Sequence, residues 1–113
     1  MKKNKIPENY LEKIPRKNEA IGWSRDEEGL VTLEIENKGI FNKIAQKLLK
    51  KPPITYIHLD PNGSFVWTEI DGEKNILKIG EAVKAHFGEK AEPLYERLSQ
   101  FIKTLEAYRF VKF

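Results

Sequence analysis

The spacing of hydrophobic residues changes along this chain, and that change limits the fold more than any other feature. Val31, Leu33 and Ile35 recur every second residue, which is the period of a strand with one buried face. From residue 61 onward, hydrophobic residues recur every three or four positions, as they do on one side of a helix. The sequence therefore predicts an α+β fold in which the strands come before most of the helices.

Three strands are predicted. Residues 20–24 and 30–36 flank an acidic turn that ends at Gly29, and this arrangement is typical of a β-hairpin. Residues 54–60, with the sequence ITYIHLD, supply a third short strand whose side chains alternate between two faces. We expect these segments to form one three-stranded antiparallel sheet.

Four helices are predicted from the same kind of pattern. An extra amphipathic helix at residues 41–50 lies between strands two and three, and two prolines follow it closely. The other three helices follow the sheet, and each has its own start signal: Asp60 with Pro61, Asn75, and Pro93. The sequence RFVKF at the end of the chain suits a terminal β segment.

The first residues differ from the rest of the chain. Residues 1–18 contain few apolar side chains and two prolines, so we expect an extended or partly disordered arm that precedes one domain at residues 19–113. The chain of 113 residues is long enough to bury a core without covalent staples, and it contains no cysteine. It has no signal-peptide or membrane-span pattern, so we expect a soluble protein of the reducing cytoplasm without a membrane partner.

Catalytic and metal-binding patterns are missing from the sequence. The two histidines, His58 and His86, have neither the spacing of metal ligands nor a nucleophile in a catalytic context. The glycines form no phosphate-binding motif. We therefore expect no enzyme activity, no bound metal and no cofactor.

A resemblance to a known family rests on the segment from residue 59 to residue 74 and on the two helical patterns after it. The pattern is Leu-Asp, a small residue, an aromatic residue in a short helix, and then Asp-Gly. The matching residues are Leu59, Asp60, Gly63, Trp67, Asp71 and Gly72. Over residues 19–113 the chain resembles the PqqD family, although the helix at residues 41–50 departs from the family pattern.

The resemblance implies both a fold and a function. The fold would be a winged helix-turn-helix domain with a three-stranded sheet followed by three helices. The function would be that of a non-catalytic peptide chaperone, or RiPP recognition element. Such a protein presents the leader of a ribosomally made precursor peptide to a modifying enzyme, frequently a radical S-adenosylmethionine enzyme.

A peptide site can be placed on this fold, because an edge strand offers unpaired backbone groups to an extended peptide. We expect the third strand to be that edge and the last helix to lie beside it. We expect Leu98, Ile102 and Leu105 to floor a groove for the peptide, although core packing suits Leu98 and Leu105 equally well. Tyr95, Ile102 and Arg109 are spaced by seven and lie beside the core stripe, so these side chains could reach a ligand. The candidate peptide-binding residues are Thr55, Tyr56, Ile57, His58, Tyr95, Leu98, Ile102, Leu105 and Arg109.

Two other functions are compatible with the sequence. A winged helix could serve a DNA-binding regulator, but Glu92, Glu96 and Glu106 lie on the last helix or directly before it, which disfavours nucleic acid as a partner. Alternatively, the helix at residues 41–50 could cover the sheet or mediate self-association, which would make the protein a docking adaptor without a peptide ligand.

Overall fold

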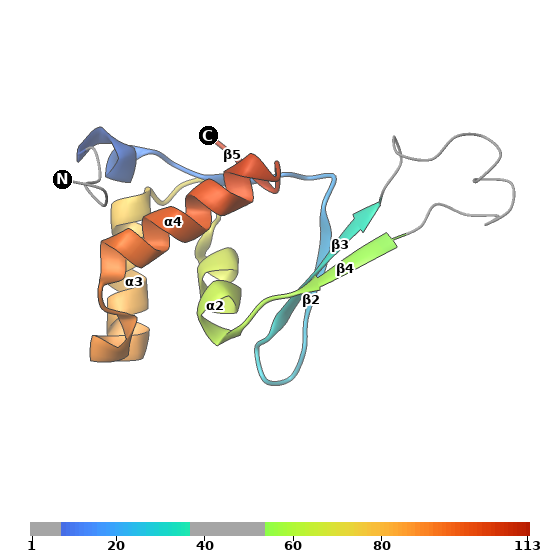
Figure 1. Ribbon diagram of the computed structural model, residues 1–113, viewed down its shortest axis with the longest axis horizontal. Helices are drawn as coiled ribbons and strands as arrows, with labels where there is room; N and C mark the ends of the chain where they lie inside the picture. The colour runs from blue at the N-terminus through green and yellow to red at the C-terminus, as the bar shows by residue number, and fades with distance from the viewer. Residues whose placement is uncertain (1–7, 37–53) are drawn as a thin grey trace, which may run out of the picture. The chain divides into compact units, whose positions relative to one another are not determined.

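The computed structural model of the chain describes residues 8–36 and 54–113, and the predicted helix at residues 41–50 lies outside them (Figure 1). The chain divides into two compact units, which we describe separately. The sheet unit comprises Glu19–Ser64, and the helical unit comprises Met1–Asn18 together with Phe65–Phe113. Within the described ranges, no helix has the length and apolar character needed to cross a bilayer.

The sheet unit contains the predicted three-stranded antiparallel sheet. Its strands are β2 (Gly22–Arg25), β3 (Val31–Glu36) and β4 (Ile54–His58), and they lie in the order β2-β3-β4. The predicted α+β class and the hairpin are therefore confirmed. Because β3 is central, β2 and β4 are the two edge strands of this sheet within the described residues.

The alternation in β3 produces one buried face, as predicted. Val31 and Leu33 have no accessible surface, whereas Thr32 and Glu34 on the opposite face are half-buried. Leu33 lies opposite Ile57 of β4, so these two side chains share the inner face of the sheet. We call the opposite side, which carries Thr32 and Glu34, the outer face.

The acidic hairpin turn is held by its own side chain. The Asp26 carboxylate accepts hydrogen bonds from the backbone N–H groups of Glu28 and Leu30, each at 2.9 Å. Gly29 completes the turn with a φ of +87°, a left-handed conformation that glycine adopts without steric cost. The carboxylate therefore has a structural role here.

The three helices after the sheet begin and end where the sequence predicts. They are α2 (Pro61–Glu69), α3 (Ile76–Phe87) and α4 (Leu94–Ala107), with a short 3-10 turn η2 (Gly88–Ala91) before α4. The border between the two units falls within α2.

Polar side chains cap the first two of these helices. Asp60 accepts from the backbone N–H of Gly63 at 2.7 Å, and Asn75 accepts from that of Lys78 at 2.8 Å. Gly88 ends α3 with a φ of +66°.

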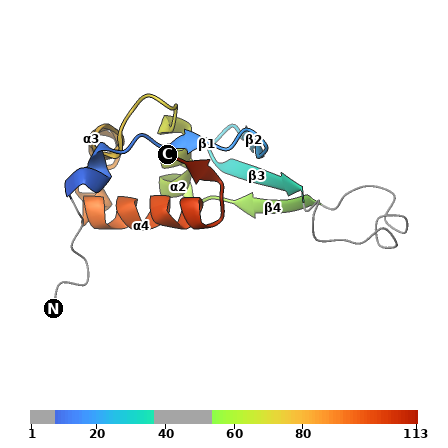
Figure 2. The same ribbon diagram turned by 90° about the horizontal axis from the view of Figure 1, so that it is seen from above.

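The N-terminal segment is more ordered than the sequence indicates. Residues 8–17 contain the 3-10 turn η1 (Glu8–Glu12) and the strand β1 (Arg16–Lys17), and β1 pairs antiparallel with β5 (Val111–Lys112), as Figure 2 shows. The expectation of an extended or partly disordered arm is therefore wrong for residues 8–17. The two ends of the chain stabilise each other through long-range pairing, which has no local sequence signal. The predicted terminal β segment is confirmed.

Candidate functional site

The outer edge of β4 offers backbone groups that no described strand of the sheet uses. Leu59 N–H donates to Val31 C=O at 2.9 Å, which makes Val31 and Leu59 a hydrogen-bonded pair in the antiparallel ladder. Because such pairs alternate, Thr55 and Ile57 direct their N–H and C=O groups toward β3. Tyr56 and His58 consequently direct theirs away from the sheet.

The β4 strand lacks the charged side chains that are common on edge strands. The strand ITYIH contains no Lys, Arg, Asp or Glu, although edge strands are commonly protected from pairing by such charges. Tyr56 is 57% exposed and Ile54 is 41% exposed. His58 is also exposed, and its Nδ1 lies 2.9 Å from Thr32 Oγ1 on the neighbouring strand. This edge is therefore accessible and uncharged.

The β2 edge differs in both composition and geometry. Asp26 N–H donates to Leu30 C=O at 3.0 Å, so Trp23 and Arg25 are the residues whose backbone groups point away from the sheet. Arg25 places a charge on this edge, and the acidic turn follows directly. Because charged side chains hinder pairing with another chain, β2 is less suited than β4 to receive an added strand, which we call the guest.

A buried serine fixes the end of the β4 segment. Ser64 Oγ accepts from Val31 N–H at 2.8 Å and donates to the Leu59 carbonyl at 3.2 Å. Ser64 has almost no accessible surface, so both bonds are shielded from water. They join the first turn of α2 to the segment after β4 and to the start of β3.

The predicted site residues on the last helix occupy very different environments. Leu98 and Leu105 are buried, in agreement with the core role considered from the sequence. Ile102 has 0% exposure, so the expectation that it lies beside the core stripe is wrong: the buried face of α4 is wide enough to include it. A fully buried side chain cannot contact a peptide in this conformation.

Tyr95 is occupied by contacts within the helical unit. Its ring packs against Gly80 of α3 so closely that a methyl group at Gly80 would overlap with it. Its hydroxyl donates to the Leu77 carbonyl at 3.1 Å. Burial raises the pKa of Tyr95, with smaller contributions from the negative charges of Glu81 and Glu92. Tyr95 therefore packs α4 against α3.

Arg109 lies just beyond α4 and is exposed. Its N–H donates to the Glu106 carbonyl at 2.8 Å, and the N–H of Phe110 donates to the Leu105 carbonyl at 2.8 Å. These two bonds form a Schellman ending, in which glycine is the usual residue at the position that Arg109 occupies with a φ of +66°.

The nine candidate residues fall into two groups. Thr55, Tyr56, Ile57 and His58 lie in the sheet unit, whereas the other five lie in the helical unit. The first group lies on β4, and the second lies on α4 or just beyond its end. Their joint role in peptide binding stays a prediction.

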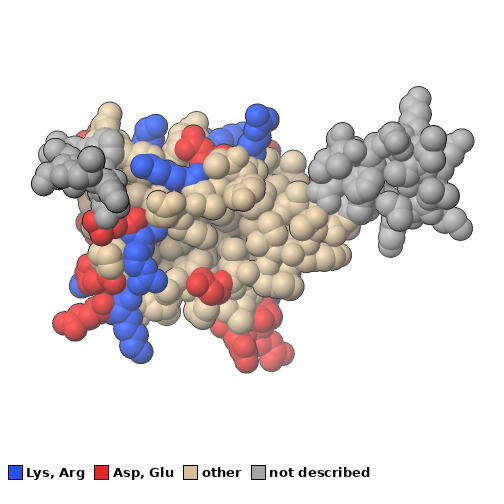
Figure 3. Space-filling model, in the orientation of Figure 1, with Lys and Arg blue, Asp and Glu red and all other residues tan. Residues whose placement is uncertain are grey.

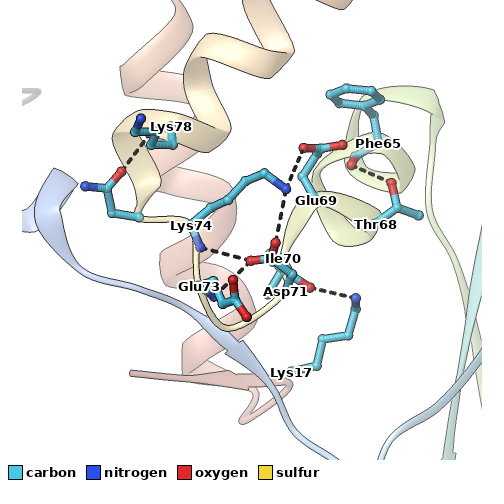
Figure 4. Close-up of polar contacts among 10 residues, drawn as sticks. Lys17, Phe65, Thr68, Glu69, Ile70, Asp71, Glu73, Lys74 and Lys78 are labelled. Carbon is cyan, nitrogen blue, oxygen red and sulfur yellow. Dashed lines mark hydrogen bonds and ion pairs between the residues drawn. The ribbon is translucent and has the colours of Figure 1, made fainter.

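The Asp-Gly pair of the sequence pattern has a local structural role (Figure 4). Asp71 accepts from the backbone N–H groups of Lys74 and Glu73, both at 2.9 Å, and its other oxygen lies 3.1 Å from Lys74 Nζ. These hydrogen bonds hold the pKa of Asp71 well below its usual range, and the bond from the Lys74 backbone N–H has the largest effect. Gly72 follows with a φ of +80°.

Lys17 makes a long-range contact with the end of α2 that the sequence did not indicate. Its Nζ donates to the Ile70 carbonyl at 2.7 Å (Figure 4). The same Nζ lies 5.5 Å from the centre of the Trp67 ring. Partial burial lowers the pKa of Lys17, and the negative charge of Asp71 opposes that shift. Lys17 thus ties the N-terminal segment to the end of α2, and Trp67 is a buried core residue.

Charged side chains of both signs occur on the surface of the described residues. Within residues 8–36 and 54–113, no three His, Asp or Glu side chains gather as a metal site would require. On the face shown in Figure 3, acidic and basic side chains are interspersed, and Glu96 and Arg97 of α4 are both exposed. A recognition helix for DNA would present a more uniformly basic face.

The family model described as Coenzyme PQQ synthesis protein D (PqqD) matches residues 30–111, which is most of the chain and includes β3, β4 and all three described α-helices. Comparison with curated proteins and with solved structures found no match.

Proposed function

The chain belongs to the PqqD family, and on this premise we propose that it is a non-catalytic chaperone for a ribosomally made precursor peptide. The leader of that peptide binds in an extended conformation and adds a strand to the outer edge of β4. The chaperone then presents the leader to a modifying enzyme, for which a radical S-adenosylmethionine enzyme is our proposed class. The winged helix-turn-helix arrangement is part of the same proposal.

The observation that carries this proposal is the accessible, uncharged edge of β4. Strand addition needs backbone donors and acceptors that point away from the sheet, and Tyr56 and His58 supply them. It also needs an edge that charged side chains do not protect. The β4 edge meets both conditions, whereas β2 carries Arg25 and continues into an acidic turn.

A proline at residue 58 tests the backbone contact directly. His58→Pro removes an N–H that points away from the sheet, so it leaves the β3–β4 hydrogen bonds in place. The control His58→Thr removes the same side chain and keeps the N–H. Probes are fluorescent synthetic leader segments of the precursor peptides encoded beside the gene for this chain, and affinity is measured by anisotropy.

We expect the proline variant to bind about five- to tenfold more weakly than the threonine variant, which is the effect of one net hydrogen bond. Equal affinity of the two variants would contradict strand addition at β4. A salt titration adds a second check, because strand addition should respond weakly to salt, whereas phosphate recognition weakens steeply.

A further inference from the structure

On the basis of the proposed function, we propose that the outer face of β4 selects the peptide by its side chains. The selecting residues are Ile54, Tyr56 and His58, which we call the outer row. A bound peptide then carries aromatic or β-branched side chains at the positions that lie beside this row. The peptide is thus read on its outer face as well as through its backbone.

The geometry of an antiparallel ladder makes this contact unavoidable. Tyr56 and His58 are the residues whose backbone groups point to the guest, and their side chains lie on the outer face, opposite Glu34 and Thr32 of β3. A guest residue that exchanges hydrogen bonds with Tyr56 lies directly opposite it and on the same face. Its Cβ then lies about 5 Å from the Cβ of Tyr56.

The outer row is chemically suited to an apolar neighbour. Tyr56 and Ile54 are large and exposed, and β4 contains no Lys, Arg, Asp or Glu. Glu34, the β3 neighbour of Tyr56, lies over Gly22 on the far side: its Oε1 is 3.4 Å from the position of a Cβ at Gly22. The Glu34 carboxylate therefore leans toward β2, which lies on the opposite side of β3 from Tyr56. Aromatic and β-branched side chains are the favoured cross-strand partners of such a residue.

The β2 edge has no equivalent row. Its residues with outward backbone groups, Trp23 and Arg25, lie opposite Leu33 and Val31, so their side chains are on the inner face. On its outer face, β2 offers only Gly22 and Ser24. Selection by an exposed outer row is thus a property of the β4 edge.

The occupant to which this row is suited is a transiently bound peptide segment. A strand of five residues offers little surface compared with the roughly 1,200 Å² that a stable protein interface buries. A leader peptide, however, must be released after presentation, so a short interface is appropriate. A second copy that pairs β4 with β4 is the competing occupant.

The test uses a phage-displayed library of random twelve-residue peptides, selected on the immobilised full chain. Three baits are compared: the unmodified chain, Tyr56→Thr, and Tyr108→Thr. Threonine keeps the backbone N–H and a high strand propensity, so Tyr56→Thr changes only the outer row. Tyr108 is also strongly exposed but lies at the end of α4, which makes it a matched control.

We expect peptides selected on the unmodified chain to carry aromatic or β-branched residues at one set of alternate positions, those on the outer face. On Tyr56→Thr, this preference should disappear. Synthetic copies of the selected peptides should bind Tyr56→Thr about two- to fivefold more weakly. They should bind Tyr108→Thr with unchanged affinity.

Each other outcome overturns the inference in a recognisable way. If peptides are selected but Tyr56→Thr changes neither preference nor affinity, the outer row does not select, while strand addition stands. If no peptide is enriched on the unmodified chain, the proposed function fails together with the inference. If sedimentation shows a dimer that Tyr56→Thr dissociates, the row serves self-association.

Discussion

The β4 residues and the α4 residues that the sequence groups into one site differ sharply in accessibility. On β4, Tyr56 is 57% exposed and directs its backbone away from the sheet. On α4, Ile102 has 0% exposure, and Leu98 and Leu105 are also buried. The strand thus presents exposed side chains and outward backbone groups, whereas Leu98, Ile102 and Leu105 of α4 belong to the core.

The largest expected effect comes from the same substitution at one isoleucine of each group. Ile102→Gln buries an amide without a partner and removes apolar contact, so it should lower the free energy of unfolding by about 3–5 kcal/mol. Ile54→Gln, on the exposed strand, should change it by less than about 0.5 kcal/mol. Urea denaturation measures both. Similar losses for the two variants would remove the contrast between β4 and α4.

Ser64 holds the end of the β4 segment, and its removal should have the next largest effect. Ser64→Ala leaves the buried Val31 N–H without its 2.8 Å acceptor, which should cost about 1–3 kcal/mol. Thr68→Ala, one turn later in α2, removes a half-buried hydroxyl that bonds only within its own helix, so its cost should be smaller. If Ser64→Ala were as stable as Thr68→Ala in urea, Ser64 would not anchor the strand.

The pH dependence of stability tests whether Tyr10 of the N-terminal segment is buried close to Glu106 of α4. Burial, and secondly the charge of Glu106 on α4, raise the pKa of Tyr10 to about 12. The folded state thus disfavours the ionised phenol. The protonated Tyr10 phenol contributes fully to the free energy of unfolding below the ordinary pKa of about 10. This contribution is lost as the pH rises from there toward 12.

The measurement for Tyr10 is the urea midpoint of the protein and of Tyr10→Phe between pH 8 and pH 11.5. The Tyr10 hydroxyl is buried and has no hydrogen-bond partner among the described residues, so Tyr10→Phe should be well tolerated at pH 8. Above pH 10, the unmodified protein should lose more stability than Tyr10→Phe. Parallel pH profiles would show that Tyr10 is not shielded beside α4.

Arg109 gives the smallest expected change in stability and separates folding from binding. Arg109→Gly relieves a left-handed backbone at φ +66° and should raise the free energy of unfolding by up to about 1 kcal/mol. Arg97→Gly, inside α4, should lower it by about 1 kcal/mol. If Arg109 contacts the peptide, Arg109→Gly will bind the leader segments more weakly although it is more stable. Unchanged affinity would remove Arg109 from the site.

Much of the fold could be predicted because its signals are local. The alternation in β3 determines its buried face, where Val31 and Leu33 are fully buried and Ile35 is half-buried, and single polar residues such as Asp60 and Asn75 cap the helices. The family was also identified from the sequence, because the order of its short elements is retained.

The environments of the helix residues could not be predicted in the same way. Tyr95, Ile102 and Arg109 are spaced by seven and therefore share one helix phase, yet one packs on Gly80, one is buried and one lies beyond the helix. Helix phase alone does not determine the width of the buried face. The N-terminal segment was missed for a related reason, because Lys17 finds its acceptor 53 residues away at Ile70.

Amide hydrogen exchange at the two edges of the sheet distinguishes pairing at β4 from pairing at β2. With a saturating leader segment, we expect the amides of Tyr56 and His58 to exchange about tenfold or more slowly, because they become donors to the guest strand. The amides of Trp23 and Arg25 on β2 should be unaffected. Peptide binding that leaves Tyr56 and His58 unprotected, or that protects Trp23 and Arg25 instead, would contradict strand addition at β4.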